Sequence, residues 1–136
     1  MKLIGRAVLL CGVSLIVTMS AFAQKRSTPS ARIGGSYDDL TVGKESGDLE
    51  GMRVILIDGG GGIYAIVQEA AGGVELPTPV LSEVTVKGAD ISFTIKFPGQ
   101  DEAQTFSGKV LVSGLRLHRG PPQSGDGTMF LKRRKC

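Results

Sequence analysis

Large apolar and polar residues alternate strictly along residues 91–97, which read Ile-Ser-Phe-Thr-Ile-Lys-Phe. A period of two places every second side chain on one face of a β-strand, so the four odd-numbered positions are expected to point into a core. Residues 80–87 alternate in a similar way, and Gly88-Ala89-Asp90 supplies a turn between the two runs. The pattern therefore predicts an antiparallel hairpin over residues 80–97.

Other short apolar runs, separated by glycine-rich breaks, continue this rhythm. The four glycines at 59–62 join two runs into another hairpin, because glycine adopts the positive φ values that tight turns require. Pro77 and Pro79 have no backbone donor, so residues 74–79 are expected to cross between hairpins outside the central strands. The expected strands cover residues 36–42, 52–58, 63–69, 80–87, 91–97, 105–110, 115–119 and 128–133.

This spacing predicts an all-β fold, built as a single antiparallel meander of about eight short strands. Such a meander forms either a small up-and-down barrel or a sandwich, and closure is favoured because a barrel leaves no unpaired edge. The domain is expected over residues 36–133. It lies between a flexible basic tail at residues 24–35 and a short basic tail at residues 134–136.

The first 23 residues have a different character. Two cationic residues precede an apolar run at residues 7–19, which is too short to span a bilayer, and Ala21-Phe22-Ala23 forms an A-x-A cleavage site. We expect residues 1–23 to be a helical signal peptide that is removed, so that the mature protein begins at Gln24. The protein would then be exported to the periplasm or the extracellular medium, without a stable membrane anchor after cleavage.

Cysteine and histidine are too scarce for the common catalytic or metal centres. Cys11 lies in the expected signal peptide, and Cys136 is the last residue. We interpret Cys136 as a solvated thiol, with an intermolecular disulfide as the alternative. His118 is the single histidine and no G-x-S-x-G elbow is present, so no zinc site or Ser-His-Asp relay can be assembled. We therefore predict no cofactor, no metal and no enzymatic activity.

The charge is distributed unevenly. Residues 36–131 contain 7 Lys and Arg against 13 Asp and Glu, a net charge of −6, whereas both ends are basic. A nucleic-acid partner is not predicted, because such a partner needs basic charge and aromatic side chains together on one face, and the chain has no Trp and 2 Tyr. We interpret the basic ends as solubilising tails, with contact to anionic lipid or a cell-wall polyanion as the alternative.

The hairpin formed by residues 52–69 is apolar on both faces, so its outer face needs a cover. That cover is the crossing at residues 74–79, a chain terminus, another envelope protein or a second copy of the chain. The candidate partner surface comprises Ile55, Ile57, Ile63 and Val67. A small apolar ligand inside the barrel is the alternative, and its candidate lining is Met52, Tyr64, Phe93, Phe97 and Phe106.

Asp38, Asp39, Asp48 and Glu50 form an acidic edge near the start of the domain. Carboxylates this close along the chain suggest a third alternative, a hydrolase that uses an acid–base pair from the Asp38–Glu50 cluster. They lack the register of a calcium loop, and we interpret them as a solvated edge. We rank protein binding slightly above ligand binding, and both above hydrolysis.

Several short motifs follow one another in a recognisable order. Gly-Asp-Leu-Glu-Gly-Met at 47–52 precedes Val-Gln-Glu at 67–69, Pro-Val-Leu at 79–81, Val-Thr-Val-Lys-Gly at 84–88, Phe-Ser-Gly-Lys-Val at 106–110 and Leu-Lys-Arg at 131–133. In this order the chain resembles small exported bacterial proteins of calycin-like or lipocalin-like architecture, over about residues 36–133. The resemblance implies an up-and-down barrel and no particular function.

Overall fold

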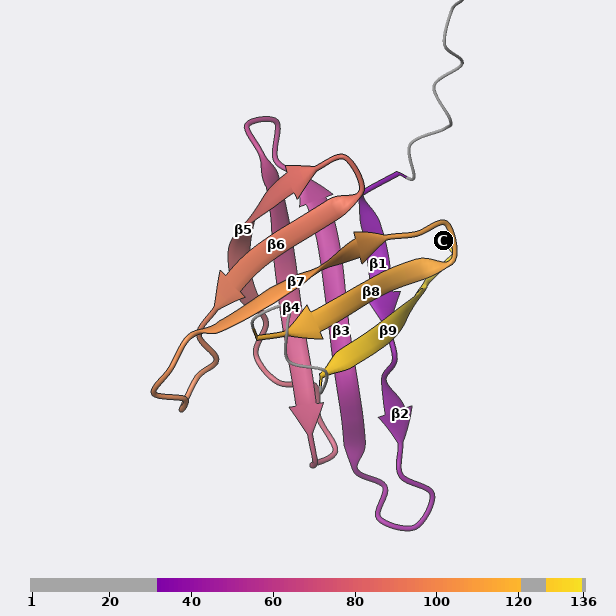
Figure 1. Cartoon of the computed structure of the whole chain (residues 1–136). Helices are drawn as coiled ribbons and strands as arrows, with labels where there is room; N and C mark the ends of the chain where they lie inside the picture. The colour runs from indigo at the N-terminus through magenta and orange to yellow at the C-terminus, as the bar shows by residue number, and fades with distance from the viewer. Residues whose placement is uncertain (1–31, 121–126, 136) are drawn as a thin grey trace, which may run out of the picture.

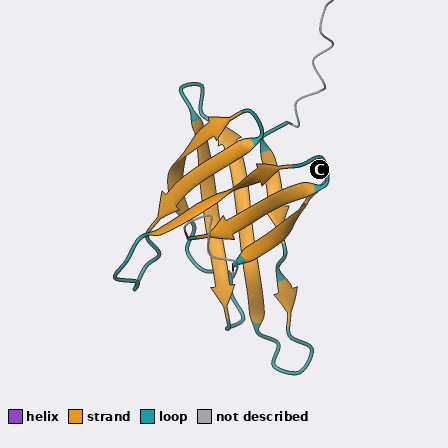
Figure 2. Ribbon diagram, viewed as in Figure 1, coloured by secondary structure: helices purple, strands orange, loops and turns teal. Residues whose placement is uncertain are grey.

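The computed structural model describes residues 32–120 and 127–135, and these residues form an all-β barrel (Figures 1 and 2). The expected signal helix at residues 1–23 lies outside the described residues. Nothing in the described part is a helix that could cross a membrane. The strands are β1 (Gly35–Asp38), β2 (Thr41–Val42), β3 (Leu49–Asp58), β4 (Ile63–Ala71), β5 (Val80–Lys87), β6 (Asp90–Ile95), β7 (Gln104–Val110), β8 (Gly114–Arg119) and β9 (Thr128–Arg133).

The strands form one antiparallel meander that closes on itself. From β3 to β9 each strand pairs with the next along the chain, and β1 pairs with both β9 and β3. Eight strands therefore form a closed ring, while the short β2 pairs with β3 beyond it. This confirms the predicted all-β meander and decides for the barrel over the sandwich. Closure also leaves the ring without an unpaired edge.

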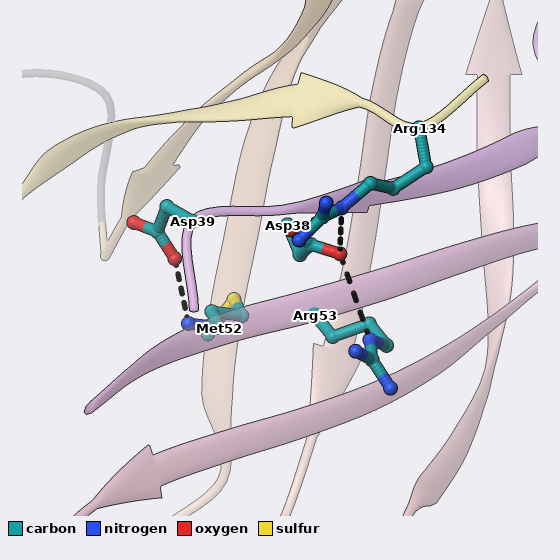
Figure 3. A network of polar contacts seen from close by, with 5 residues as sticks. All are labelled: Asp38, Asp39, Met52, Arg53 and Arg134. Carbon is teal, nitrogen blue, oxygen red and sulfur yellow. Dashed lines mark hydrogen bonds and ion pairs between the residues drawn. The ribbon is translucent and has the colours of Figure 1, made fainter. Parts of the chain in front are cut away.

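The single strand expected at residues 36–42 is interrupted at Asp39 and Leu40. Asp39 Oδ1 accepts a hydrogen bond from the Met52 backbone N–H at 2.7 Å, where a backbone carbonyl would accept in a regular ladder (Figure 3). Gly51 permits this close approach, because it has a φ of 109° and an added Cβ would lie 2.9 Å from the Asp39 carbonyl oxygen. The interruption divides the expected strand into β1 and β2.

The connections follow the turn chemistry of the sequence. In the β3–β4 hairpin, Gly60 has a φ of 77°, and its N–H donates to Asp58 Oδ1 at 2.8 Å. The segment that contains Pro77 lies outside the strands, as predicted, and the Pro77 carbonyl accepts a hydrogen bond from Gln68 Nε2 at 2.9 Å. β6 ends at Ile95, two residues before the alternating run does.

Apolar side chains of the barrel strands fill its interior. Phe93 and Phe106 stack with their ring centroids 5.3 Å apart and an angle of 16° between the planes. The other core side chains that are at least nine-tenths buried are Tyr37, Met52, Val54, Leu56, Ala65, Val67, Val84, Ile91, Ile95, Phe97, Val110, Leu115, Leu117 and Leu131. An interior occupied in this way behaves as a packed core.

The barrel closes where β1 meets β9, and this seam has only two residue pairs in register. Asp38 lies on its outer side and is 4% exposed. Arg134 Nε donates to both carboxylate oxygens of Asp38, at 2.9 and 2.8 Å, and Arg53 Nε lies 3.7 Å from Oδ2 (Figure 3). Two cations from neighbouring elements therefore compensate one buried carboxylate, as burial of a charge requires.

Tyr37 lies on the inner side of the same seam and is fully buried. Its hydroxyl donates to the Ile33 carbonyl oxygen at 2.9 Å. The Arg133 guanidinium donates to that hydroxyl and lies 5.1 Å from the centre of the Tyr37 ring. Side chains thus reinforce both surfaces of a seam in which the backbone contributes little. The contacts of Ile33 and Arg134 also extend the folded unit slightly beyond residues 36–133.

Alkaline pH is expected to weaken this seam. Burial raises the pKa of Tyr37 above its ordinary value of 10.0, although the charge and hydrogen bond of Arg133 act in the opposite direction. The unfolded chain therefore loses this proton first, and stability from Tyr37 is full below pH 10 and is lost as the pH rises through the higher folded pKa. Urea midpoints measured from about pH 8 to pH 11 should fall more steeply than those of Tyr37→Phe. Parallel curves for the two proteins would contradict the prediction.

Candidate functional site

Three adjacent strands carry apolar side chains on the outside of the barrel. Cross-strand register pairs Ile55 with Ile66, Ile57 with Tyr64, and Ile66 with Leu81, so these five residues of β3, β4 and β5 form one continuous patch. Leu81 is 63% exposed and Ile57 is 40% exposed, while the other three are half-buried. We call this patch the apolar face. Outward positions of a sheet in contact with water are usually polar, so the face is unusual.

Of the residues predicted for a partner surface, those of β3 lie on the outer face of the barrel and those of β4 do not. Ile55 and Ile57 face outward, but Val67 is fully buried and Ile63 packs against the core. Tyr64, which was expected in the interior, lies on the outer face opposite Ile57. The cause is the hairpin register, which places the even-numbered residues of β4 outside. Because both faces of β4 are apolar, the alternation alone could not distinguish them.

The other candidate interior residues lie where they were expected. Met52, Phe93 and Phe106 are at most 3% exposed, and they pack against neighbouring core side chains. Phe97 is 8% exposed and lies just beyond the end of β6, where it borders a hollow. We call the end of the barrel at which β4 and β6 finish the lower end, as it is drawn in Figure 1. A ligand in the centre of the barrel would have to displace these side chains.

An ion pair closes the lower end of the barrel and was not anticipated from the sequence. Arg119 of β8 donates to the Glu69 carboxylate of β4, a strand on the opposite side of the eight-strand ring. The Arg119 guanidinium also lies 5.4 Å from the centre of the Phe106 ring. Outside this pair is a half-open hollow of about 580 Å³, lined by Glu69, Ala71, Pro77, Thr78, Phe97, Pro98, Gln100 and Arg119.

Three of the four residues of the acidic edge have separate structural partners. Asp38 is buried against Arg53 and Arg134, and Asp39 accepts from the Met52 N–H. Asp48 Oδ1 accepts from the Gly73 N–H at 3.3 Å, and Glu50 is exposed. Within residues 32–120 and 127–135, no three His, Cys, Asp or Glu side chains lie close enough together to hold a metal ion.

The apolar face is therefore one candidate place for recognition, and the hollow beside Glu69 and Arg119, which we call the lower mouth, is another. The apolar face is formed by residues from three strands of a closed barrel, whereas the mouth is lined by strand ends and loops. No protein-family model matches the chain, and neither a curated protein nor a solved structure matches it significantly.

Proposed function

We propose that the mature chain is an exported binding protein that recognises another protein of the cell envelope through the apolar face. The observation that carries the proposal is the exposure of Leu81 and Ile57, at 63% and 40%, beside three further apolar side chains on adjacent strands. Contiguous apolar surface on a soluble domain is typical of an interaction site. Exposed aromatic and aliphatic side chains on a rigid sheet also lose little conformational entropy on binding.

The packed interior supports protein binding over ligand transport. Phe93 stacks on Phe106, and the Glu69–Arg119 pair lies across the barrel at its lower end. A carrier of apolar ligands normally encloses a cavity of about 300–1,000 Å³ that buries most of the ligand. The hollows lined by described residues include four of about 580–650 Å³ each, and these open at the ends or the outer surface of this barrel.

The partner can be identified by cross-linking from defined positions. A photoreactive phenylalanine analogue placed at Leu81 should cross-link to the partner in intact cells, whereas the same group at Lys96 should not. Lys96 is also exposed but follows β6, outside the apolar face. Cross-linking that is equally strong from both positions would contradict the proposal. A cross-link to a second copy of the chain would show self-association in place of a different partner.

Removing the two most exposed apolar side chains should weaken the complex without unfolding the barrel. For Ile57→Ser combined with Leu81→Ser, we expect a loss of about 2 kcal/mol, or about 30-fold in Kd, against the cross-linked partner. Titration calorimetry measures this change. The matched control is Val42→Ser, because Val42 is 63% exposed like Leu81 but belongs to β2. An unchanged Kd for the double variant would contradict the assignment of this face.

A small ligand at the lower mouth is the second candidate. Its hollow combines apolar walls, which include Pro77 and Phe97, with the charged side chains of Glu69 and Arg119. Native mass spectrometry of protein isolated from its own host detects such a ligand as an added mass. A bound molecule that is lost from Phe97→Ala but retained by Leu81→Ser would favour this function over protein recognition.

A further inference from the structure

The side of the barrel opposite the apolar face is basic. β8 lies four places from β4 in the ring of eight strands, and Figure 1 shows β8 in front of β3 and β4. On the outer surface of β7, β8 and β9, register places Lys109 beside Arg116, Arg116 beside Phe130, and Lys132 beside Gly114. We call Lys109, Arg116, Phe130 and Lys132 the basic face. None of the three strands carries an Asp or Glu.

The positive charges of this face are poorly compensated within the protein. Like charges directly opposite each other in a sheet are destabilising, and Lys109 and Arg116 form such a pair. Lys109 has one ion pair, with Asp90 at 3.6 Å, and both side chains are more than half exposed. Among the described residues, neither Arg116 nor Lys132 has an ion pair or side-chain hydrogen bond. An external anion would relieve this repulsion.

Exposed apolar side chains lie among these cations. Phe130 is 41% exposed, and its ring lies over Gly114, where an added Cβ would come within 2.7 Å of Phe130 Cζ. Val112, in the turn between β7 and β8, is 85% exposed. The same turn contacts the end of β9, because the Ser113 carbonyl accepts from the Arg133 N–H at 3.1 Å. Apolar tips and basic side chains are therefore neighbours at one end of the barrel.

We propose that this surface docks the barrel on an anionic phospholipid bilayer, with the basic face against the headgroups and Phe130 and Val112 entering the interface. Lys and Arg are attracted to anionic headgroups. Burial of exposed apolar side chains at the boundary with the acyl chains makes the binding free energy more favourable still. Single-stranded nucleic acid is a poorer match, because successive bases stack on several aromatic side chains and this face presents one. The proposal concerns the opposite side of the molecule from the apolar face and does not depend on the protein partner.

The arrangement combines two recognition surfaces on one rigid body. A barrel seated on the membrane through β7–β9 would present β3–β5 away from the bilayer, because β4 and β8 lie on opposite sides of the ring. Docking is reversible in this proposal, since a few cations and two apolar tips give weaker attachment than a spanning segment.

Vesicle co-sedimentation tests the proposal. Protein without residues 1–23, whose apolar run would itself bind lipid, is mixed with vesicles of phosphatidylcholine alone or with equal parts of phosphatidylglycerol. Binding is expected only to the anionic vesicles, and it should fall when the salt is raised from about 0.1 M to about 1 M, which shortens the Debye length from ~10 to ~3 Å. Equal binding to both vesicle types would overturn the proposal.

Charge-matched variants locate the contact. Each Lys or Arg near an anionic bilayer increases partitioning about fivefold, so Arg116→Gln combined with Lys132→Gln should weaken binding about 25-fold. Lys44→Gln combined with Lys96→Gln removes the same charge from exposed positions outside the basic face and should change binding less than about twofold. Phe130→Ser should also weaken binding, without any change in charge.

Circular dichroism confirms that every variant is folded before its binding is compared. Each remaining outcome then either supports or overturns docking on a bilayer. Equal losses in the two double variants would show that net charge alone controls binding and would overturn the assignment of this face. Tight binding of an oligothymidylate that depends on Arg116 and Lys132, with no binding to anionic vesicles, would assign the surface to nucleic acid and overturn the bilayer.

Discussion

Phe106→Ala is expected to lower the free energy of unfolding by about 3–5 kcal/mol. The side chain is fully buried, stacks on Phe93, and supports the Arg119 guanidinium on its other side. Alanine would leave a cavity that the closed ring of strands cannot collapse to fill. Because domains of this size are stable by only about 5–15 kcal/mol, the loss should move the urea midpoint strongly, as followed by far-ultraviolet circular dichroism.

Two substitutions control for this result. Phe106→Leu keeps most of the apolar volume and should cost about 1.5 kcal/mol or less. Thr85→Ala, at an exposed position on β5, should change stability by less than about 0.5 kcal/mol. A loss below about 1 kcal/mol for Phe106→Ala would mean that the interior tolerates an empty space. In that case a packed interior would no longer disfavour a ligand inside the barrel.

The architecture was predictable because the strong strands are amphipathic and their turns carry the appropriate residues. The bounds of β5 and β9 agree with the expected runs at residues 80–87 and 128–133, and the 59–62 turn joins β3 to β4 as predicted. Closure followed from the even spacing of the strands and from the cost of unpaired edges. These features depend on neighbours along the chain, which the sequence displays directly.

The faces of β4 and the break between β1 and β2 were not predictable in this way. Tyr64 and Val67 are both compatible with a core, so only the tertiary register decides between them. The break depends on Asp39 replacing a backbone acceptor for Met52, a contact across the sheet. Neither feature produces a periodic pattern of apolar and polar residues in the sequence.

The inward-pointing arginines did leave a signal. Arg119 is an odd-numbered residue of β8, like the inward-facing Leu115 and Leu117. Arg133 is likewise an odd-numbered residue of β9, like the inward-facing Leu131. Both arginines therefore stand at the ends of core-facing rows. A charged residue at the last inward position of a strand can extend to the rim of a barrel. The partners Glu69 and Tyr37, which lie far away in the sequence, could be identified only from the closed ring.

Tyr37→Ala is expected to lower stability by about 3–5 kcal/mol and to act first on the seam that closes the barrel. β1 and β9 share only two pairs in register, whereas β3 and β4 share nine, so side-chain contacts carry a larger part of the seam. Removal of the ring eliminates the buried apolar surface of Tyr37 and the contact between the ring and the Arg133 guanidinium. Opening there would expose the edges of β1 and β9, which are prone to pairing with other chains.

Native-state hydrogen exchange measures this effect strand by strand. In Tyr37→Ala, the amides of β9 should lose more protection than those of β4, because a local opening of the seam precedes global unfolding. Tyr37→Phe retains the ring and loses only the hydroxyl contacts to Arg32, Ile33 and Arg133, so its cost should be about 1 kcal/mol. Equal losses of protection in β9 and β4 would show that the barrel opens as one cooperative unit, and that the seam is no weaker than the other strand pairs.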